Sequence, residues 1–214
     1  MLPLVRSADA LAPLQFTLLA SSAQLHRPEM VNALAQAIGT GGIAAERLCI
    51  ELPASAAPHD AGILERFADL RRLGVQLALG DFDDSPGSRL ALKVLRPDSV
   101  SLDVRRLGNS GARGSSPDLA ERLHSACVMA RRAGVAVCAK GVESRQQLET
   151  VRAWGCHGVQ GYLLAQPFPA AWLVQTHAAM RATKLPPKQS PAPVASTGLT
   201  GYGATSVRDS GVAT

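Results

Sequence analysis

The sequence predicts an α/β fold, an incomplete TIM-like (β/α) barrel with about six predominantly parallel strands. Short apolar runs alternate along the chain with longer segments of helical spacing, the order expected of a parallel sheet joined by crossover helices. The runs are near-continuous, as in strands that are buried on both faces. An open doubly wound sheet fits the same pattern. No Gly-x-Gly-x-x-Gly follows the first strand, however, which weakens the dinucleotide-binding alternative.

The strands are predicted from apolar runs that end at turn residues. The run after Pro13 is short, the next one ends at Pro53, and the third leads into a polar loop that begins at Gly80. The expected strands cover residues 16–19, 48–52, 75–79, 98–103, 135–139 and 159–164.

The helices are predicted from apolar residues spaced three and four apart and from residues that begin or end helices. Pro28 suits a first turn, Ser116 is placed to cap the helix that starts with Pro117, and Gly74 and Gly134 stand where helices should end. The expected helices cover residues 28–39, 60–73, 90–95, 117–132, 144–154 and 170–183.

The chain is expected to form one large domain, since its 214 residues suffice to bury a sizeable core. We expect a leader at 1–15, the domain at 16–184 and a disordered tail at 185–214, because the tail is rich in Pro, Ser, Thr, Gly and Ala. No apolar run approaches the roughly 18 residues of a membrane span, and the first residues lack the features of a secretory signal. The expectation is a soluble cytoplasmic protein with no membrane partner.

Charge and cysteine usage disfavour two classes of function. The formal net charge is +5, but the basic residues are spread out and aromatic residues are few, so we expect no nucleic-acid partner. The four cysteines, Cys49, Cys127, Cys138 and Cys156, show no Cys-x-x-Cys spacing. A zinc site is therefore not expected, and reduced thiols that pack as small apolar groups are.

Polar residues at the carboxyl ends of the strands form the candidate site. In parallel barrels the functional groups lie at these ends, which here carry Glu51, Asp81, Asp103, Lys140 and Gln160. A structural alternative stays open. One of the three carboxylates would form an ion pair with Lys140, and Gln160 would only satisfy backbone groups.

Several motifs, in this order and spacing from about residue 16 to residue 173, resemble the EAL family of metal-dependent phosphodiesterases, which hydrolyse the bacterial second messenger cyclic di-GMP. They are Glu51-Leu52, Asp81-Phe82, Asp103, Gly141-Val142-Glu143 and Val159-Gln160-Gly161-Tyr162. The resemblance implies a barrel and a vestigial ligand-binding set made up of Glu51, Asp81, Asp103, Glu143 and Gln160.

The sequence also departs from the family pattern at positions that, by the resemblance, serve the metals and the catalytic water. Leu19 replaces an Asn, Gly80 the first Asp of Asp-Asp-Phe-Gly, Ser101 the Lys of Lys-Ile-Asp, and Lys140 the first Glu of Ala-Glu-Gly-Val-Glu. The Glu-Ala-Leu motif and the two strands expected before Phe16 are missing, which implies an N-terminal truncation.

These departures predict a degenerate, non-catalytic module. Two-metal hydrolysis requires several oxygen ligands, and of the implied set only Glu51 and Gln160 clearly persist, with Asp81 a partial substitute. We expect no catalytic residue and no cofactor, with cyclic di-GMP, a protein partner or self-association as the binding mode. The alternatives are an active phosphodiesterase, which alone would need Mg²⁺ or Mn²⁺, and a truncated, non-functional fragment.

Overall fold

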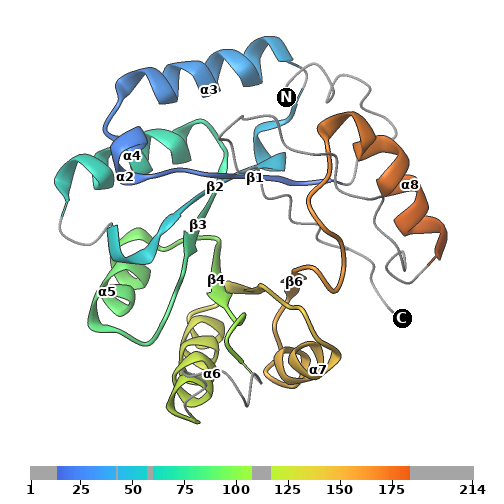
Figure 1. The fold of residues 1–214 in the computed structure, drawn as a ribbon. Coiled ribbons are helices and arrows are strands. Elements are labelled where there is room, and N and C mark those ends of the chain that lie inside the picture. Colours follow the sequence, from blue (N-terminus) through green and yellow to red (C-terminus); the bar gives the residue numbers. More distant parts are fainter. Residues whose placement is uncertain (1–13, 42, 57–59, 108–116, 184–214) are drawn as a thin grey trace.

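A computed structural model describes residues 14–41, 43–56, 60–107 and 117–183, which form one curled parallel sheet with helices on its outer side (Figure 1). The six strands are hydrogen-bonded in chain order, from β1 to β6. The predicted fold class is thereby confirmed as a half-barrel. The expected tail at 185–214 and residues 1–13 of the expected leader lie outside the described residues.

The strands agree with the prediction except at some ends. They are β1 (Phe16–Leu19), β2 (Leu48–Pro53), β3 (Gln76–Gly80), β4 (Ser99–Asp103), β5 (Ala136–Lys140) and β6 (Gly158–Gln160). The prediction that the last strand reaches residue 164 was wrong. The chain turns at Gly161, whose carbonyl accepts hydrogen bonds from the N–H groups of Leu164 and Ala165, at 3.0 and 3.2 Å.

The helices also follow the predicted order. They are α2 (Ser22–Leu25), α3 (Pro28–Gly41), α4 (Ala61–Arg72), α5 (Pro86–Leu95), α6 (Pro117–Arg132), α7 (Arg145–Ala153) and α8 (Leu173–Thr183), with short 3₁₀ turns at 45–47, 54–56 and 170–172. α5 begins four residues before the predicted start, because the Ser85 hydroxyl caps it by accepting from the N–H of Ser88. α2 was not predicted; a capping box between Ser21 and Gln24 forms it.

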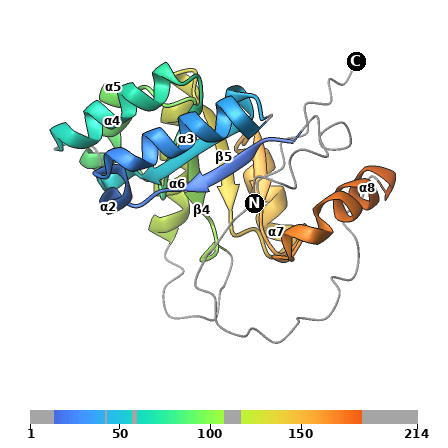
Figure 2. The same cartoon turned by 90° about the horizontal axis from the view of Figure 1, so that it is seen from above.

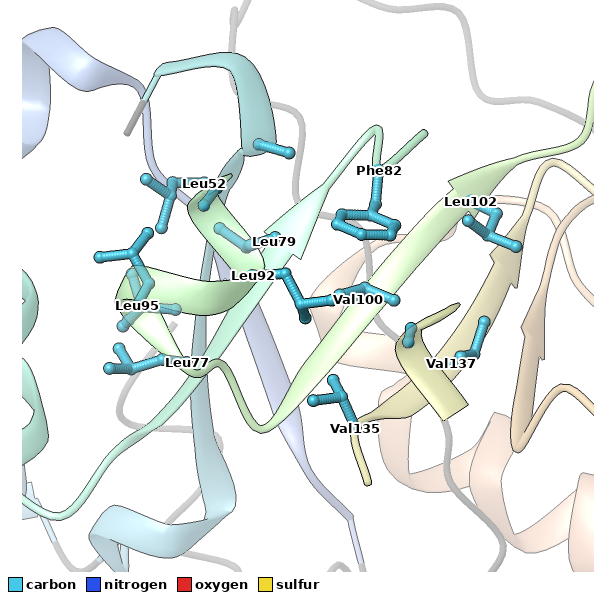
Figure 3. Packing of buried hydrophobic residues seen from close by; sticks show 14 of the residues in the cluster. Leu52, Leu77, Leu79, Phe82, Leu92, Leu95, Val100, Leu102, Val135 and Val137 are labelled. Carbon is cyan, nitrogen blue, oxygen red and sulfur yellow. The ribbon is translucent and has the colours of Figure 1, made fainter. Parts of the chain in front are cut away.

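The apolar core lies between the outer face of the sheet and the helices. Ile50, Leu77, Val100 and Val137 are at most 1% exposed, and α4 packs against β3 while α6 packs against β4 and β5. Figure 3 shows side chains from β2 to β5 meeting those of α5 in this layer. α8 stands at the margin of the helix layer in both views (Figures 1 and 2). No described helix is long and apolar enough to cross a membrane.

The inner face of the sheet carries small and polar residues. Along β4 the sequence alternates strictly, so that Val100 and Leu102 face the helices and Ser99 and Ser101 face inward. The expectation of near-continuous apolar strands was therefore too simple. The strongly curled sheet leaves little space on its inner side, and small residues fill it.

Candidate functional site

A cation and a carboxylate meet across the concave side of the sheet. Glu51 lies near the end of β2 and Lys140 ends β5; in a flat sheet three strand spacings of about 4.8 Å would hold them about 14 Å apart. Because the sheet curls, the Lys140 Nζ lies 2.5 Å from Oε1 and 2.6 Å from Oε2 of Glu51. The Glu51 and Lys140 side chains are only 8% and 20% exposed. The strand-end position therefore holds a largely buried ion pair.

Two further positions at which the resemblance implies a substitution, Ser101 and Gly80, lie against this ion pair. The Ser101 hydroxyl donates to Glu51 Oε1 at 3.1 Å. Gly80 provides space, since a Cβ built at this position would lie 2.5 Å from the same oxygen, which is closer than real carbon atoms approach. Gly80, Ser101 and Lys140 thus form one arrangement, in which the carboxylate of Glu51 packs over a glycine and contacts the Lys140 ammonium.

A second charge pair lies beside the first, at the end of β4. Asp103 accepts hydrogen bonds from the guanidinium of Arg105 and, at 3.0 Å, from its backbone N–H. Asp103 is the register partner of Lys140, yet its ion pair is with Arg105. Burial works to raise the pKa of Asp103, but the hydrogen bonds and charge of Arg105 outweigh it, so the pKa lies below its ordinary value.

Arg105 is the site residue that the sequence analysis missed. Its pKa is raised by the hydrogen bond and charge of Asp103, with contributions from the charges of Asp81 and Glu143. Its side chain passes over Gly141, which has a φ of +77° and no room for a Cβ beside the Arg105 Cγ. The only signal for Arg105 in the sequence was its position, two residues after an aspartate that ends a predicted strand.

The loop that presents Arg105 is held by α7. The Nε2 group of Gln147, which is 3% exposed, donates to the carbonyls of Val104 and Leu107, at 3.1 and 2.8 Å. Its Oε1 accepts from the N–H of Glu143 at 2.7 Å. One buried amide therefore fixes two neighbouring strand ends relative to each other.

The other predicted site residues line the mouth of the half-barrel without joining the buried pair. Asp81 and Glu143 are exposed, and Asp81 adopts a left-handed backbone with φ 49°. Gln160 is partly exposed, and its backbone carbonyl accepts from the N–H of Val142 at 3.0 Å. Leu19, the register partner of Glu51, is 51% exposed at the same edge.

The donor set at this position does not fit a divalent metal. Both oxygens of Glu51 contact the Lys140 ammonium, and neither Leu19 nor Gly80 offers a side-chain oxygen. Within the part of the chain that the structure describes, no group of three or more His, Cys, Asp or Glu side chains is arranged to hold a metal ion. Hard cations need several oxygen ligands, so we derive no metal-dependent step at this site.

Below the ion pair the inner face of the sheet encloses a small cavity of about 30 Å³. It is lined mainly by short side chains, among them Thr17, Cys49, Ala78 and Cys138. A cavity of this size holds a water molecule or two. A nucleotide would therefore have to lie across the mouth, over the strand ends.

The family model of the EAL domain matches residues 2–167. The chain belongs to the EAL domain family. This EAL domain is 31% identical, over 173 residues, to the cyclic di-GMP phosphodiesterase NbdA of Pseudomonas aeruginosa, with 79% of this chain and 21% of that protein covered. The bifunctional diguanylate cyclase/cyclic di-GMP phosphodiesterase MucR of the same organism is 30% identical over 158 residues, which cover 72% of this chain and 22% of MucR.

Solved EAL domains share the fold. The domain of Mycobacterium smegmatis DcpA superposes with a TM-score of 0.71 at 23% identity, covering 81% of this chain and 77% of that chain. The domain of Xanthomonas citri FimX, solved in complex with cyclic di-GMP, gives a TM-score of 0.68 at 20% identity, covering 78% and 66%. At these identities the likeness concerns the fold. The chain spans about a fifth of the length of the curated relatives that it matches.

Proposed function

We propose that this EAL domain is non-catalytic and acts in cyclic di-GMP signalling by binding the dinucleotide or a partner protein. The observation that carries the proposal is the contact between Lys140 and both oxygens of Glu51. An ammonium group holds the carboxylate that the resemblance assigns to a metal.

Electrostatics supports this reading. Two unit positive charges 4 Å apart repel by roughly 4 kcal/mol at an effective dielectric constant of 20, and a dication doubles that figure. A metal at Glu51 would therefore have to displace Lys140, whose side chain is four-fifths buried. Gly80 and Leu19 offer no side-chain oxygen to offset the displacement.

A turnover assay tests the catalytic half of the proposal. Purified protein with cyclic di-GMP and Mn²⁺ or Mg²⁺ should release no more linear dinucleotide than the Glu51→Gln variant. Lys140→Glu removes the cation and adds a carboxylate, and Lys93→Glu makes the same charge change at an exposed position on α5. Tighter Mn²⁺ binding by Lys140→Glu alone supports Lys140 as the barrier. Metal-dependent turnover by the unmodified protein that Glu51→Gln abolishes would overturn the proposal.

Calorimetric titration with cyclic di-GMP in the absence of metal separates the two binding roles. The mouth offers Arg105 as a cation and Tyr162, 62% exposed, as an aromatic surface, and the FimX domain is described in complex with the same dinucleotide. Heat that Arg105→Ala reduces supports a nucleotide receptor. Absence of heat at high micromolar nucleotide favours the protein-binding role.

The sheet edges favour association with other chains. Among the described residues, β1 pairs only with β2 and β6 only with β5, and open strand edges invite pairing. We therefore propose self-association or a partner that covers an edge. Size-exclusion chromatography with light scattering should show a species larger than a monomer. A monomer at micromolar concentration that unfolds cooperatively would show that the chain satisfies its own edges.

A further inference from the structure

Two cysteines that are distant in sequence face each other on the outer side of the sheet. Cys127 lies on α6, and Cys156 lies in the turn between α7 and β6. Their sulfur atoms are 3.9 Å apart. Cys127 is fully buried and Cys156 is half-buried, so a small solute approaches the pair from the Cys156 side.

Arg131 lies on the same turn-facing side of α6. Its Nη1 donates to the carbonyl of Trp154 at 3.0 Å, and the Cys127 thiol is 3.5 Å from the same oxygen. Arg131 also covers Gly155, where a Cβ would come within 2.6 Å of Nη1. The guanidinium is thus fixed beside the two sulfur atoms.

The contact between the two sulfur atoms shifts the pKa values of the two thiols in opposite directions. The contact with Cys156 lowers the pKa of Cys127, against the opposing effect of burial and with the help of the Arg131 charge. The same contact, followed by burial, raises the pKa of Cys156.

We propose that Cys127 and Cys156 form a site of reversible oxidation, in which hydrogen peroxide converts the two thiols into a disulfide between α6 and the turn before β6. One thiol of the pair gives its proton to solvent, and the thiolate attacks a peroxide oxygen. The O–O bond breaks, the leaving hydroxide takes up a proton to become water, and that cysteine becomes a sulfenic acid. The sulfur of the other cysteine then attacks the sulfenic sulfur, the S–O bond breaks, and the departing hydroxide leaves as water with the proton of the second thiol. Two electrons from the two sulfurs reduce one peroxide to two waters.

The required movement is small. A disulfide has an S–S length of about 2.05 Å, so the sulfurs must approach by about 1.9 Å from their separation of 3.9 Å. Cys156 lies in a turn, next to His157, whose ring and backbone bond to Val137 of β5 at 3.1 and 2.8 Å. The turn can adjust while β6 stays anchored to β5.

The disulfide would raise the stability of the fold and leave the residues at the mouth of the half-barrel in place. Cys156 precedes β6, whereas Gln160 and Lys140 stand at the carboxyl ends of β6 and β5. A bond that closes the loop from 127 to 156 constrains the unfolded chain, and for a loop of this length the melting temperature should rise by about 5–10 °C.

Peptide mapping provides the direct test. Trypsin places the four cysteines in separate peptides, at residues 48–66, 123–131, 133–140 and 153–181. After stoichiometric hydrogen peroxide, non-reducing mass spectrometry should find peptide 123–131 joined to 153–181, with a loss of two hydrogens that dithiothreitol reverses. The melting temperature should rise with oxidation and fall with reduction.

Cys138 is the matched control. It lines the inner cavity, so Cys138→Ser should leave the crosslink and the shift unchanged, whereas Cys156→Ser should abolish both. The mapping uses the unmodified protein and so does not depend on the folding of a Cys127 variant. A crosslink that includes Cys138, or oxidation to sulfinic acid at the same rate in Cys156→Ser as in the unmodified protein, would overturn the proposal.

Discussion

Two ion pairs at the same end of the sheet differ in burial and in the sequence separation of their partners. Glu51 and Lys140 come from β2 and β5, 89 residues apart, with side chains 8% and 20% exposed. Asp103 and Arg105 are two residues apart, with side chains 33% and 66% exposed. The first pair connects β2 and β5 across the concave side of the half-barrel. The second pair lies entirely at the end of β4.

The difference in burial between the two ion pairs determines how much each contributes to the stability of the fold. A buried carboxylate destabilises the fold when its cation is removed. An exposed carboxylate that loses its cation is solvated by water, so the loss of stability is small. The buried pair should therefore govern folding and exclude metal. The exposed pair remains available to a ligand at the mouth.

The largest effect is expected for Lys140→Ala. This change leaves the Glu51 carboxylate buried without its cation, and breaking a buried pair on one side costs about 3–5 kcal/mol. Urea denaturation measures the loss in unfolding free energy, with Lys93→Ala on the exposed face of α5 as the control. Replacing both partners, Glu51→Leu with Lys140→Met, should recover most of the stability. A loss for Lys140→Ala within about 0.5 kcal/mol would show that Lys140 is solvated.

The next effect concerns the glycine beneath the pair. Gly80→Ala introduces a Cβ that would lie 2.5 Å from Glu51 Oε1, so the carboxylate or the strand must move, at a cost of about 1–3 kcal/mol. Gly87→Ala is the matched control, because nothing lies within 4 Å of a Cβ there and alanine favours the α5 helix. Equal unfolding free energies for the two variants would contradict the packing argument.

Sequence reasoning reached the fold because strand and helix signals are local. Ser144 and Gly74 mark helix ends in the sequence as they do in the structure. The partner of Lys140 was not predictable in the same way. Glu51, Asp81 and Asp103 were all at strand ends, and only the curvature of the sheet decides that Glu51 is within reach. The role of Gly80 was not predictable for the same reason. The lack of a Cβ at Gly80 matters only because the Glu51 side chain lies over this position.

A smaller effect is expected at the exposed pair. Arg105→Ala should cost at most about 1 kcal/mol, in contrast to Lys140→Ala. Because the pKa of Asp103 is lowered in the folded protein, the stabilisation is present above the unfolded value of 3.8 and lost as pH falls through the lower folded value. The Arg105→Ala penalty should therefore shrink between about pH 5 and pH 2. A penalty that is unchanged in acid would contradict the assignment of Asp103 as the partner.

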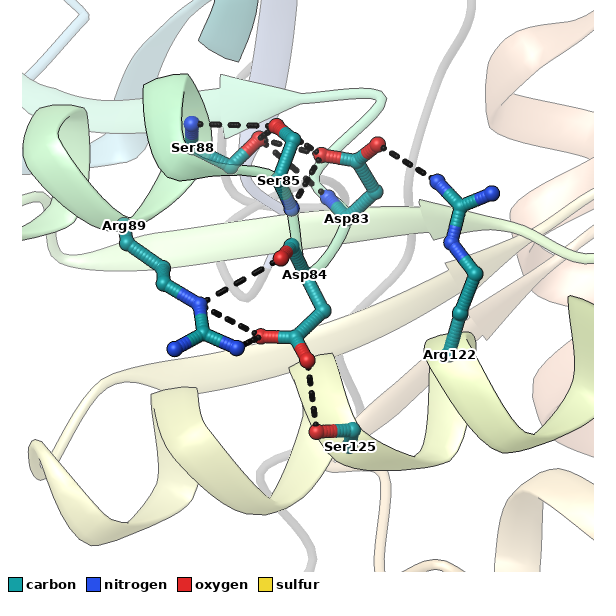
Figure 4. A network of polar contacts seen from close by, with 7 residues as sticks. All are labelled: Asp83, Asp84, Ser85, Ser88, Arg89, Arg122 and Ser125. Atoms are coloured by element: carbon teal, nitrogen blue, oxygen red, sulfur yellow. Dashed lines mark hydrogen bonds and ion pairs between the residues drawn. The ribbon is translucent and has the colours of Figure 1, made fainter.

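The smallest effect is expected at the contact between α6 and the loop before α5 (Figure 4). Arg122 reaches Asp83 through one contact of 3.3 Å, and its side chain is 50% exposed. Asp83 is already held by the hydroxyls of Ser85 and Ser88, at 2.5 and 2.6 Å. Burial would raise the pKa of Asp83, but these hydrogen bonds outweigh it and Arg122 contributes least.

Arg122→Ala should accordingly change the unfolding free energy by less than about 0.5 kcal/mol. The effect should vanish in 0.5 M salt, because Debye screening is strong there. Ser88→Ala removes a buried donor to the same carboxylate and should cost more, about 1 kcal/mol, at any ionic strength. If Arg122→Ala were the costlier change, the charge of Arg122 and not the serine hydroxyls would hold this loop. An exposed ion pair on the surface of the domain would then contribute more to stability than the pair of Asp103 and Arg105 at the strand end.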